Sequence, residues 1–492
     1  MINKKLGLLL CCCPFGILSA QHFAQITMGN YAGVHAAKIN PALTAGSKYL
    51  WHVNLIGLWG NLNSRYIKTD IPVRQYTKIN NGDPILLENN NGPSVWNNPN
   101  STEILNGKSV NAFAAAMAYG PSFIFKIKGF SVGLISDATS MARVRGLDEK
   151  LAHAGWLKMD TANGSSDLFK IKQGANSESI SKTTIATSRW ASIGITASYE
   201  LPLKWQRSIM IGLSLRKLWG LGAEFYQNDA FDVRNAGAGI MQLDNPNFRV
   251  GVIDARGSGV GADLGVGYTI RKREYLQNGD YKFKHPDYVA RLGFSILDLG
   301  SVLYQNVQLG AANGNIAWNS NNAVGKYGNV TPGVPGINTI IADLPGYSIF
   351  RQNLRIGQPA RMAFTADYQF RKHWFIQGQW VQSLRSAFGI SARHPSYFMV
   401  GPRYESDLFA FTLPVMLEYD YRAVRAAMSI RLGPIYIGSN SLLSVIKTRG
   451  VRDADYFIGI AFGDIAGSWI NRLNGEKEEK AKRKKGRDCE KI

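Results

Sequence analysis

Apolar and polar residues alternate along most of this chain. From Ala191 to Tyr199 every second residue is apolar, and small or hydroxyl-bearing residues lie between them. The same period of two recurs over 207–217, 258–270 and 422–432. Successive side chains of a β-strand point to opposite faces of the sheet. The pattern therefore predicts strands with one apolar and one polar face.

About 14 such strands are expected, which makes the predicted fold all-β. They cover 49–60, 110–120, 128–145, 187–200, 207–217, 258–270, 287–298, 359–370, 373–384, 396–404, 407–418, 422–432, 434–446 and 455–463. A length of about ten residues suits a tilted strand that crosses a bilayer. A soluble sandwich also alternates, but the even count lets a barrel close without a free edge. We predict a closed transmembrane antiparallel β-barrel over 49–464.

Two further patterns favour a membrane barrel. Long connections, at 61–109, 146–186, 218–257 and 299–358, alternate with short turns, and long outer loops with short inner turns place both termini in the periplasm. Aromatic residues lie at the strand ends, where an interfacial girdle is expected. These residues are Trp51, Trp59, Trp190, Tyr199, Trp219, Tyr288, Tyr368, Phe370 and Trp374. We therefore expect the protein in a bacterial outer membrane, in contact with its lipid.

Composition excludes two other classes of protein. Hydrophobic residues make up 45% of the 492 residues and charged residues only 18%, which argues against a disordered chain. After Leu10, no apolar run approaches the roughly 18–20 residues that a membrane-spanning helix needs. If the chain lies in a membrane, strands must carry it there.

The chain begins with the plan of a secretory signal peptide over 1–20. Lys4 and Lys5 precede an apolar run over 6–18, and small residues follow it. Cleavage would remove Cys11–Cys13 with the signal. Cys489 would then be the single cysteine of the mature chain, and no disulfide framework is expected.

The formal net charge is +21, and part of the excess is concentrated at the carboxyl end. The segment 465–492 is expected to be a basic, partly helical periplasmic tail, solvated or in contact with anionic headgroups, an acidic partner or the cell-wall polymer. No recognised nucleic-acid-binding motif accompanies it. We therefore expect no nucleic-acid partner.

Polar and charged residues also occur on the minor face of the predicted strands. Such side chains are tolerated on barrel strands where they face the lumen. They could form a network that stiffens the wall, line a permeation path, or hold an inserted segment. The predicted lumen-facing set is Arg216, Asp263, Arg291, Asp367, Gln377, Gln379, Arg425 and Arg431.

Two sequence patterns match catalytic or cofactor-binding motifs, but the predicted structure around them does not fit those motifs. Gly129–Gly133 fits G-x-S-x-G, but that motif needs a strand that turns into a helix, and this one lies within a continuing strand. Gly257–Ala262 fits G-x-G-x-x-A without a following βαβ unit. No two of the seven histidines have the i, i+4 spacing of a helical metal site. We expect no catalytic residue, no metal site and no cofactor.

The stretch 28–60 carries a family resemblance. Asn30-Tyr31-Ala32-Gly33 and Asn40-Pro41-Ala42, leading into a strand, resemble the amino-terminal region of the FadL-type long-chain fatty-acid channels. They resemble more closely a poorly characterised family of Bacteroidota outer-membrane barrels. The resemblance implies a 14-stranded barrel whose segment 21–48 folds back into the lumen as a hatch. The hatch residues would be Asn30, Tyr31, Gly33, Asn40, Pro41 and Ala42.

Asn40-Pro41 also has a simpler interpretation as a turn, because Asn before Pro favours turn initiation. Two functions therefore stay open. One is a passive channel for a small hydrophobic or amphipathic solute, gated by the hatch. The other is a non-transporting barrel that serves as a subunit of an outer-membrane secretion or assembly complex.

Overall fold

The structure is a computed structural model. It describes residues 24–69, 79–80, 83–84, 101–127, 129–156, 177–237, 240–271, 288–319, 333–442 and 451–465. The predicted signal peptide at 1–20 lies outside the described residues, as does all of the predicted basic tail beyond Ile465. Both therefore stay predictions.

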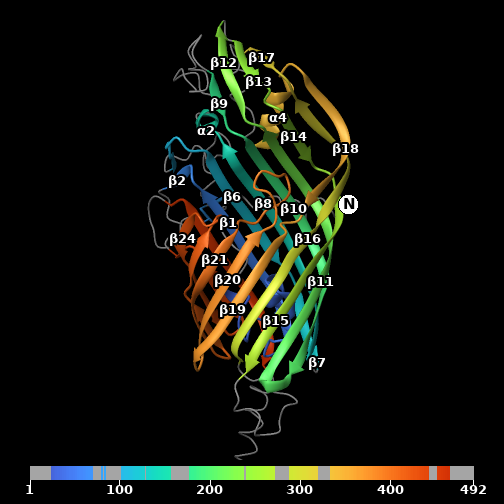
Figure 1. The fold of residues 1–492 in the computed structure, drawn as a ribbon, viewed down its shortest axis with the longest axis vertical. Coiled ribbons are helices and arrows are strands. Elements are labelled where there is room, and N and C mark those ends of the chain that lie inside the picture. The colour runs from blue at the N-terminus through green and yellow to red at the C-terminus, as the bar shows by residue number, and fades with distance from the viewer. Residues whose placement is uncertain are drawn as a thin grey trace, which may run out of the picture.

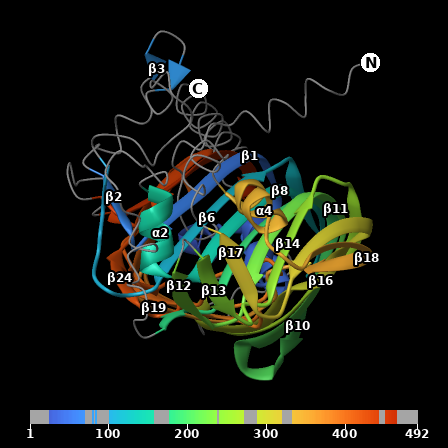
Figure 2. The ribbon, with the colours of Figure 1, turned by 90° about the horizontal axis from the view of Figure 1, so that it is seen from above.

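The chain forms a closed antiparallel barrel with a ring of 14 strands (Figures 1 and 2). The first wall strand, β1 (Tyr49–Ser64), pairs with the last, β27 (Asp453–Ile465), and on its other side with β6 and β7. This pairing satisfies the backbone at what would otherwise be two sheet edges. The predicted fold class and strand number are confirmed.

Short interruptions divide several wall strands into two segments that share one place in the ring. The remaining wall strands are β6 (Val110–Tyr119) with β7 (Ser122–Ile127), β8 (Phe130–Leu147), β10 (Thr183–Leu203), β11 (Arg207–Asn228), β14 (Phe248–Ile253) with β15 (Gly257–Arg271), β16 (Tyr288–Ala312), β18 (Tyr347–Gly357) with β19 (Arg361–Arg371), β20 (Trp374–Ser383), β21 (Tyr397–Glu405), β22 (Phe409–Thr412) with β23 (Val415–Glu418), β24 (Ala423–Ala426) with β25 (Met428–Leu432), and β26 (Ile435–Ser439).

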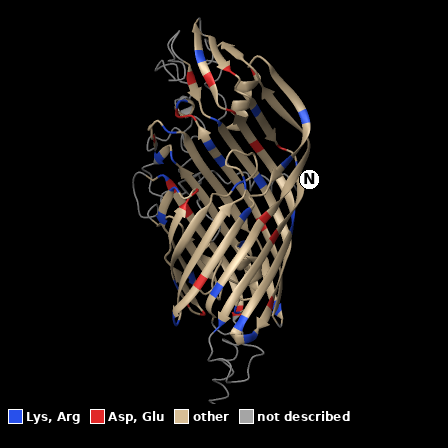
Figure 3. Ribbon diagram, in the orientation of Figure 1, with Lys and Arg blue, Asp and Glu red and all other residues tan. Residues whose placement is uncertain are grey.

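Apolar side chains cover the outside of the wall, as the alternation predicts. On β11, for example, Ile209, Ile211, Leu213 and Leu215 are exposed, whereas Ser214 between them is buried. Charged residues gather mostly toward the two ends of the barrel (Figure 3). The outer surface thus has the apolar band that a bilayer requires.

Three of the predicted girdle aromatics do not face outward. Trp59, Trp190 and Tyr288 are only 1%, 4% and 0% exposed, so their assignment to an interfacial girdle was wrong. Register shifts at Asn54/Ile56 and at Ile270/Arg271 interrupt the simple period near Trp59 and Tyr288, whereas Trp190 lies on the inward face of the regular alternation of β10. A bulge moves the following residues to the other face of a strand.

Two predicted outer loops, 218–257 and 299–358, are largely strand, so the loop assignment there was wrong. β11 continues to Asn228 and β16 to Ala312, which makes this side of the wall taller (Figure 1). Above the apolar band the polarity of the faces reverses: Val307 and Leu309 are buried, and Gln308 between them is exposed. The alternation persists there, but its apolar face packs inward against a cap.

The cap lies beyond this taller wall. It contains a four-stranded sheet in the order β17-β13-β12-β9, and its buried core includes Phe231, Met241 and Val334. The elements outside the wall are β9 (Glu178–Ile180), β12 (Phe231–Gly237), β13 (Ile240–Asp244), β17 (Ile316–Asn319), α2 (Glu149–Trp156), α4 (Val334–Ala342), β2 (Ile67–Thr69), β3 (Ile79–Asn80), β4 (Asp83–Pro84), β5 (Ser101–Glu103) and the turn η8 (Lys204–Gln206). None of the helices in the described part of the chain has the length and apolarity needed to cross a membrane.

Candidate functional site

A segment from Ala24 to Lys48, called here the N-terminal segment, lies inside the barrel. It consists of the short 3-10 helices η1 (Ala24–Ile26), η2 (Gly33–Lys38) and η3 (Pro41–Thr44). Nearly all of its residues are buried. The structure therefore places all six residues of the predicted hatch in the barrel interior, while hatch movement stays a prediction.

The wall holds this segment both by its side chains and by its backbone. Lys38 forms a buried ion pair with Asp137, and Gln25 Nε2 donates to Ser439 O at 3.1 Å. Other hydrogen bonds end on backbone carbonyl oxygens of the segment. These run from Gln379 Nε2 to Ala24 O (2.7 Å), Tyr119 Oη to Val34 O (3.3 Å), Arg361 Nη2 to Lys38 O (3.2 Å), Ser295 Oγ to Ile39 O (2.6 Å) and Arg291 Nη2 to Gly46 O (3.0 Å).

Both ends of the Asn40 amide are hydrogen-bonded, one within the segment and one to the wall. Its Oδ1 accepts a hydrogen bond from Ala42 N at 2.9 Å, which caps η3. Its Nδ2 donates to Val266 O at 2.9 Å and to Phe294 O at 3.2 Å, on the neighbouring strands β15 and β16. The residue is therefore both the turn former that Asn-Pro predicts and a contact with the wall.

The wall behind Asn40-Pro41-Ala42 is lined by glycines. Gly212 lies directly opposite Gly265, and Gly267 opposite Gly293, on three adjacent strands. A Cβ atom at Gly265 would lie 2.0 Å from Asn40 Oδ1, and one at Gly212 would lie 2.3 Å from Ala42 N. These glycines form a recess, called here the glycine recess, into which the segment fits.

Replacement of Asn40 by Asp tests whether the wall binds the Asn40 side chain or whether this residue only forms a turn. Asp caps a helix about as well as Asn, so a simple turn would tolerate the change. In this structure a carboxylate would face two carbonyl oxygens in place of the Nδ2 donor, which should cost more than the about 1 kcal/mol typical of a lost cap. We expect the free energy of unfolding in detergent to decrease in the order wild type, Asn40→Ala, Asn40→Asp. Equal stability of the wild-type and Asn40→Asp proteins would support the simple turn.

The other hatch residues are fixed near the end of the barrel where the chain enters β1. Asn30 donates from its backbone N to Glu405 Oε1 at 3.3 Å, and its side chain also contacts this carboxylate. Tyr31 donates to Asp407. Gly33 has a φ of 56°, and a Cβ there would lie 2.4 Å from His52 Cγ. Only glycine fits this position without strain.

The predicted polar residues fall into separate ionic networks in the interior. Arg216 pairs with Asp263 at 2.6 Å and with Asp298 at 2.7 Å, and Arg361 also reaches Asp298. Near Asn30, Asp367 and Gln377 both bind Arg403, which also pairs with Glu405 at 3.0 Å. Charges taken from water are tolerated when they are paired in this way.

The remaining predicted residues play distinct parts. Arg425 pairs with Asp453 at 2.8 Å and Glu418 at 3.3 Å. Arg431 is only half-buried and donates to the backbone carbonyls of Ser406 and Asp407. Arg425 thus braces the wall, whereas Arg291 and Gln379 contact the N-terminal segment directly. Arg431 contacts it as well, since its guanidinium lies over the Tyr31 ring, 5.2 Å from the centroid.

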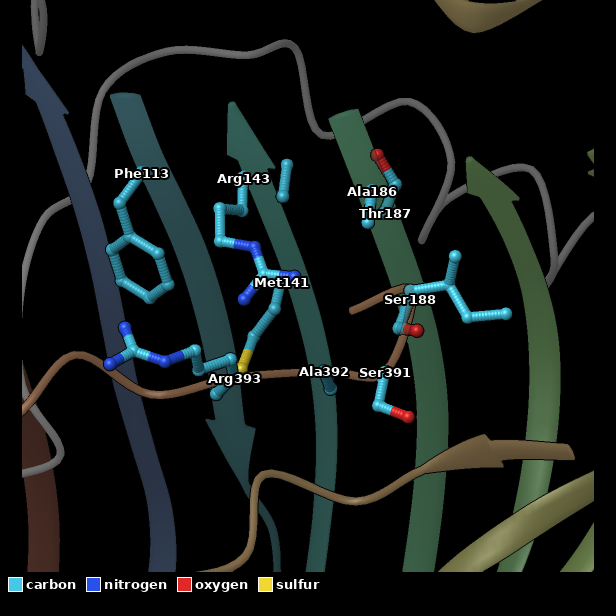
Figure 4. Close-up of a pocket in the computed structure, with 11 residues that line it drawn as sticks. Phe113, Met141, Arg143, Ala186, Thr187, Ser188, Ser391, Ala392 and Arg393 are labelled. Atoms are coloured by element: carbon cyan, nitrogen blue, oxygen red, sulfur yellow. The ribbon is translucent and has the colours of Figure 1, made fainter. Parts of the chain in front are cut away.

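A second segment, Leu384–Ser396, also crosses the interior; it is called here the 384–396 loop (Figure 4). It joins β20 to β21 and reaches strands on another part of the ring. Phe388 O accepts hydrogen bonds from Thr184 Oγ1 at 2.9 Å and Gln227 Nε2 at 2.7 Å. Sequence reasoning missed this loop, since only its Arg385 and Arg393 distinguish it from an ordinary connection.

Two small cavities lie beside these segments. A cavity of about 10 Å³ lies between the 384–396 loop and β6, β8 and β10 (Figure 4). Another, of about 20 Å³, lies between the N-terminal segment and the network of Arg216, Asp263 and Asp298. Each has room for about one water molecule, so passage of a larger solute here requires one of the segments to move.

Comparisons with known proteins were made with the whole chain. The model of a protein family described as a family of unknown function (DUF5723) matches residues 41–440. No curated protein matches.

Several solved structures are similar to this chain. The toluene transporter TbuX of Ralstonia pickettii has 10% identity and a TM-score of 0.41, over 91% of this chain and 98% of that one. The toluene transporter TodX of Pseudomonas putida has 10% identity and a TM-score of 0.40, over 90% and 97%. A FadL homologue of Pseudomonas aeruginosa has 12% identity and a TM-score of 0.37, over 87% and 93%.

Proposed function

From the premise that the chain belongs to the DUF5723 family, whose function is unknown, we propose that it is an outer-membrane channel. It passes small hydrophobic or amphipathic solutes passively, and the N-terminal segment is its hatch. The observation that carries the proposal is that this segment lies buried in the lumen, where wall side chains hold it by hydrogen bonds and by the Lys38–Asp137 ion pair. A Bacteroidota origin stays a prediction from the motif.

The outer surface supports the membrane location. Large apolar side chains are exposed around the ring, for example Phe125, Ile195, Val266 and Ile437. In water such a surface would cause aggregation, whereas a bilayer solvates it. Tyr49 and Ile465 pair at the end of the barrel that carries the short turns, which is the periplasmic end in the usual orientation of such barrels.

Release of the segment would break its hydrogen bonds, each of which contributes only about 0.5–1.5 kcal/mol net because water can replace it. It would also expose apolar side chains such as Ala32, Ile39 and Leu43 and break the buried Lys38–Asp137 ion pair. The wall itself closes through β1 and β27 without the segment.

Deletion of Asn30–Gly46 tests this function. We expect the flux of a small amphipathic solute into liposomes to rise by at least about tenfold, because the lumen loses most of its filling. Wild-type protein and protein-free liposomes are the controls, and resistance of the deleted barrel to unfolding in detergent shows that the wall is intact. Unchanged flux through an intact deleted barrel would contradict the proposal.

The alternative, a non-transporting subunit of a secretion or assembly complex, draws on the filled interior and on the cap. The cavities beside the two segments hold about 10 and 20 Å³, and the cap sheet extends beyond the wall (Figure 1). This function predicts partner proteins that co-purify from native membranes in mild detergent. Recovery of the barrel alone would count against it.

A further inference from the structure

Arginine residues converge around the 384–396 loop, at the end of the barrel opposite to the one where Tyr49 and Ile465 pair. Arg143 and Arg145 point inward from β8, and Arg393 comes from the loop. Arg65 directly follows β1, and Arg422 directly precedes β24. Arg145 lies within electrostatic range of Arg65, Arg393 and Arg422. These residues are called here the arginine cluster.

The loop depends on this cluster for its position. Arg143 donates to the backbone carbonyls of Ser386 and Gly389, and Arg145 lies over the Phe388 ring, 5.8 Å from its centroid. Arg143 and Arg393 line the same small cavity (Figure 4). Arg143 Nε is buried and has no hydrogen-bond partner in the structure.

Asp420 is the carboxylate that faces the cluster. It receives two hydrogen bonds from Arg393, at 2.7 and 3.0 Å, and one from Ser396 N at 3.0 Å. Burial acts to raise the pKa of Asp420, but these hydrogen bonds and the Arg393 charge hold the pKa below its ordinary value. In the described part of the chain, the Asp420 carboxylate thus acts on Arg65, Arg143 and Arg145 as well as on Arg393.

The turn that carries Asp420 is strained. Tyr419, Asp420 and Tyr421 have φ values of 51°, 59° and 63°. Each residue in this left-handed region costs about 1–2 kcal/mol when it is not glycine, and such strain persists only where the surroundings impose it. The Arg393–Asp420 pair is therefore a latch that opposes the strain of its own turn.

We propose that the arginine cluster binds an anionic group, a carboxylate, phosphate or sulfonate, that competes with Asp420 for Arg393 and releases the 384–396 loop. Guanidinium groups match the oxygens of such anions with paired hydrogen bonds, and an added anion relieves the mutual repulsion of the arginines. That the anion belongs to a passing solute rests on the proposed channel function. The binding itself does not.

Calorimetric titration of the full-length protein in non-ionic detergent with pyrophosphate tests the site. The predicted basic tail is also expected to attract anions. The quantity compared is therefore the affinity for pyrophosphate of the wild-type protein and of the double variant Arg65→Gln/Arg145→Gln. We expect this double variant to bind at least about tenfold more weakly. Arg207→Gln, which removes an exposed arginine from the start of β11 at the other end, is the matched control. Identical binding by the double variant and the control would overturn the proposal.

Asp420→Asn tests the competition. Without the carboxylate, Arg393 is free to bind the added anion, so we expect affinity for pyrophosphate to rise several-fold. Asp420→Glu keeps the competing charge and should restore weaker binding. If Asp420→Asn binds no more tightly than wild type, the latch is not in competition with the anion and that step is overturned.

A third comparison separates this inference from the channel function. Octanoate and octanol share a chain and differ in charge, so cluster-dependent binding of octanoate but not octanol identifies an amphiphile as a source of the anion. Cluster-dependent binding of pyrophosphate alone identifies a free anion. Either result supports the anion site even if deletion of Asn30–Gly46 leaves flux unchanged. If neither octanoate nor pyrophosphate shows cluster-dependent binding, the anion site is overturned, and the proposed hatch is unaffected.

Discussion

Gly265→Ala is expected to drive the N-terminal segment out of its recess and to increase solute flux in proteoliposomes by roughly ten- to hundredfold. The added Cβ would lie 2.0 Å from Asn40 Oδ1 and 3.0 Å from Pro41 Cδ. Neither neighbour can move away without loss of the Asn40 contacts to Val266 and Phe294. Overpacking of this kind costs about 1–3 kcal/mol. Such a cost increases the ratio of unseated to seated segments by roughly ten- to hundredfold.

Gly378→Ala is the matched control for this prediction. Gly378 also lies in a wall strand, β20, but a Cβ there would find its nearest neighbour at 3.7 Å. Its flux should equal that of wild type. Wild-type flux through the Gly265→Ala protein, with its barrel intact, would show that the segment does not seal the lumen at the glycine recess.

Arg403→Met is expected to lower the free energy of unfolding by about 3–5 kcal/mol, the usual cost of leaving buried charge unpaired. Arg403 is 2% exposed and pairs with Asp367 at 2.6 Å and Glu405 at 3.0 Å. Methionine fills a similar volume but leaves both carboxylates without their partner. Because Glu405 also holds Asn30, the start of the N-terminal segment should loosen as well.

Denaturant unfolding of the barrel in detergent micelles measures this loss. Arg371→Met, which removes an exposed arginine from the end of β19, should change stability by less than about 0.5 kcal/mol. Arg403→Lys keeps the charge and should lose less than Arg403→Met. Equal stability of Arg403→Met and wild type would mean that the network contributes no net stability.

The wall was predictable because its signal is local. Each strand of the membrane band alternates between lipid and lumen, and the period of two appears within any ten residues, such as those of 258–270. The upper parts of β11 and β16 were not predicted as strands, because their apolar face turns inward toward the cap. Trp59 and Tyr288 were misplaced because one bulge exchanges the faces of a strand without changing its composition.

The interior was predictable only in part. Asn40-Pro41-Ala42 was singled out as a motif, but its recess is made by Gly212, Gly265 and Gly293, which are distant in the chain and look like ordinary wall glycines. Arg403 and the 384–396 loop were missed for a related reason. Their partners are brought together by closure of the ring, and no local pattern records which strands become neighbours across it.

A reversible lock tests most directly whether the N-terminal segment opens. Thr44 Oγ1 and Ser198 Oγ lie 2.6 Å apart, one on η3 and the other on β10. Thr44→Cys/Ser198→Cys, in a chain that also carries Cys489→Ser, should therefore form a disulfide between hatch and wall. We predict that solute flux in proteoliposomes is abolished when the pair is oxidised and returns to the wild-type level after reduction. Equal flux in the oxidised and reduced states would contradict the account of the N-terminal segment as a hatch.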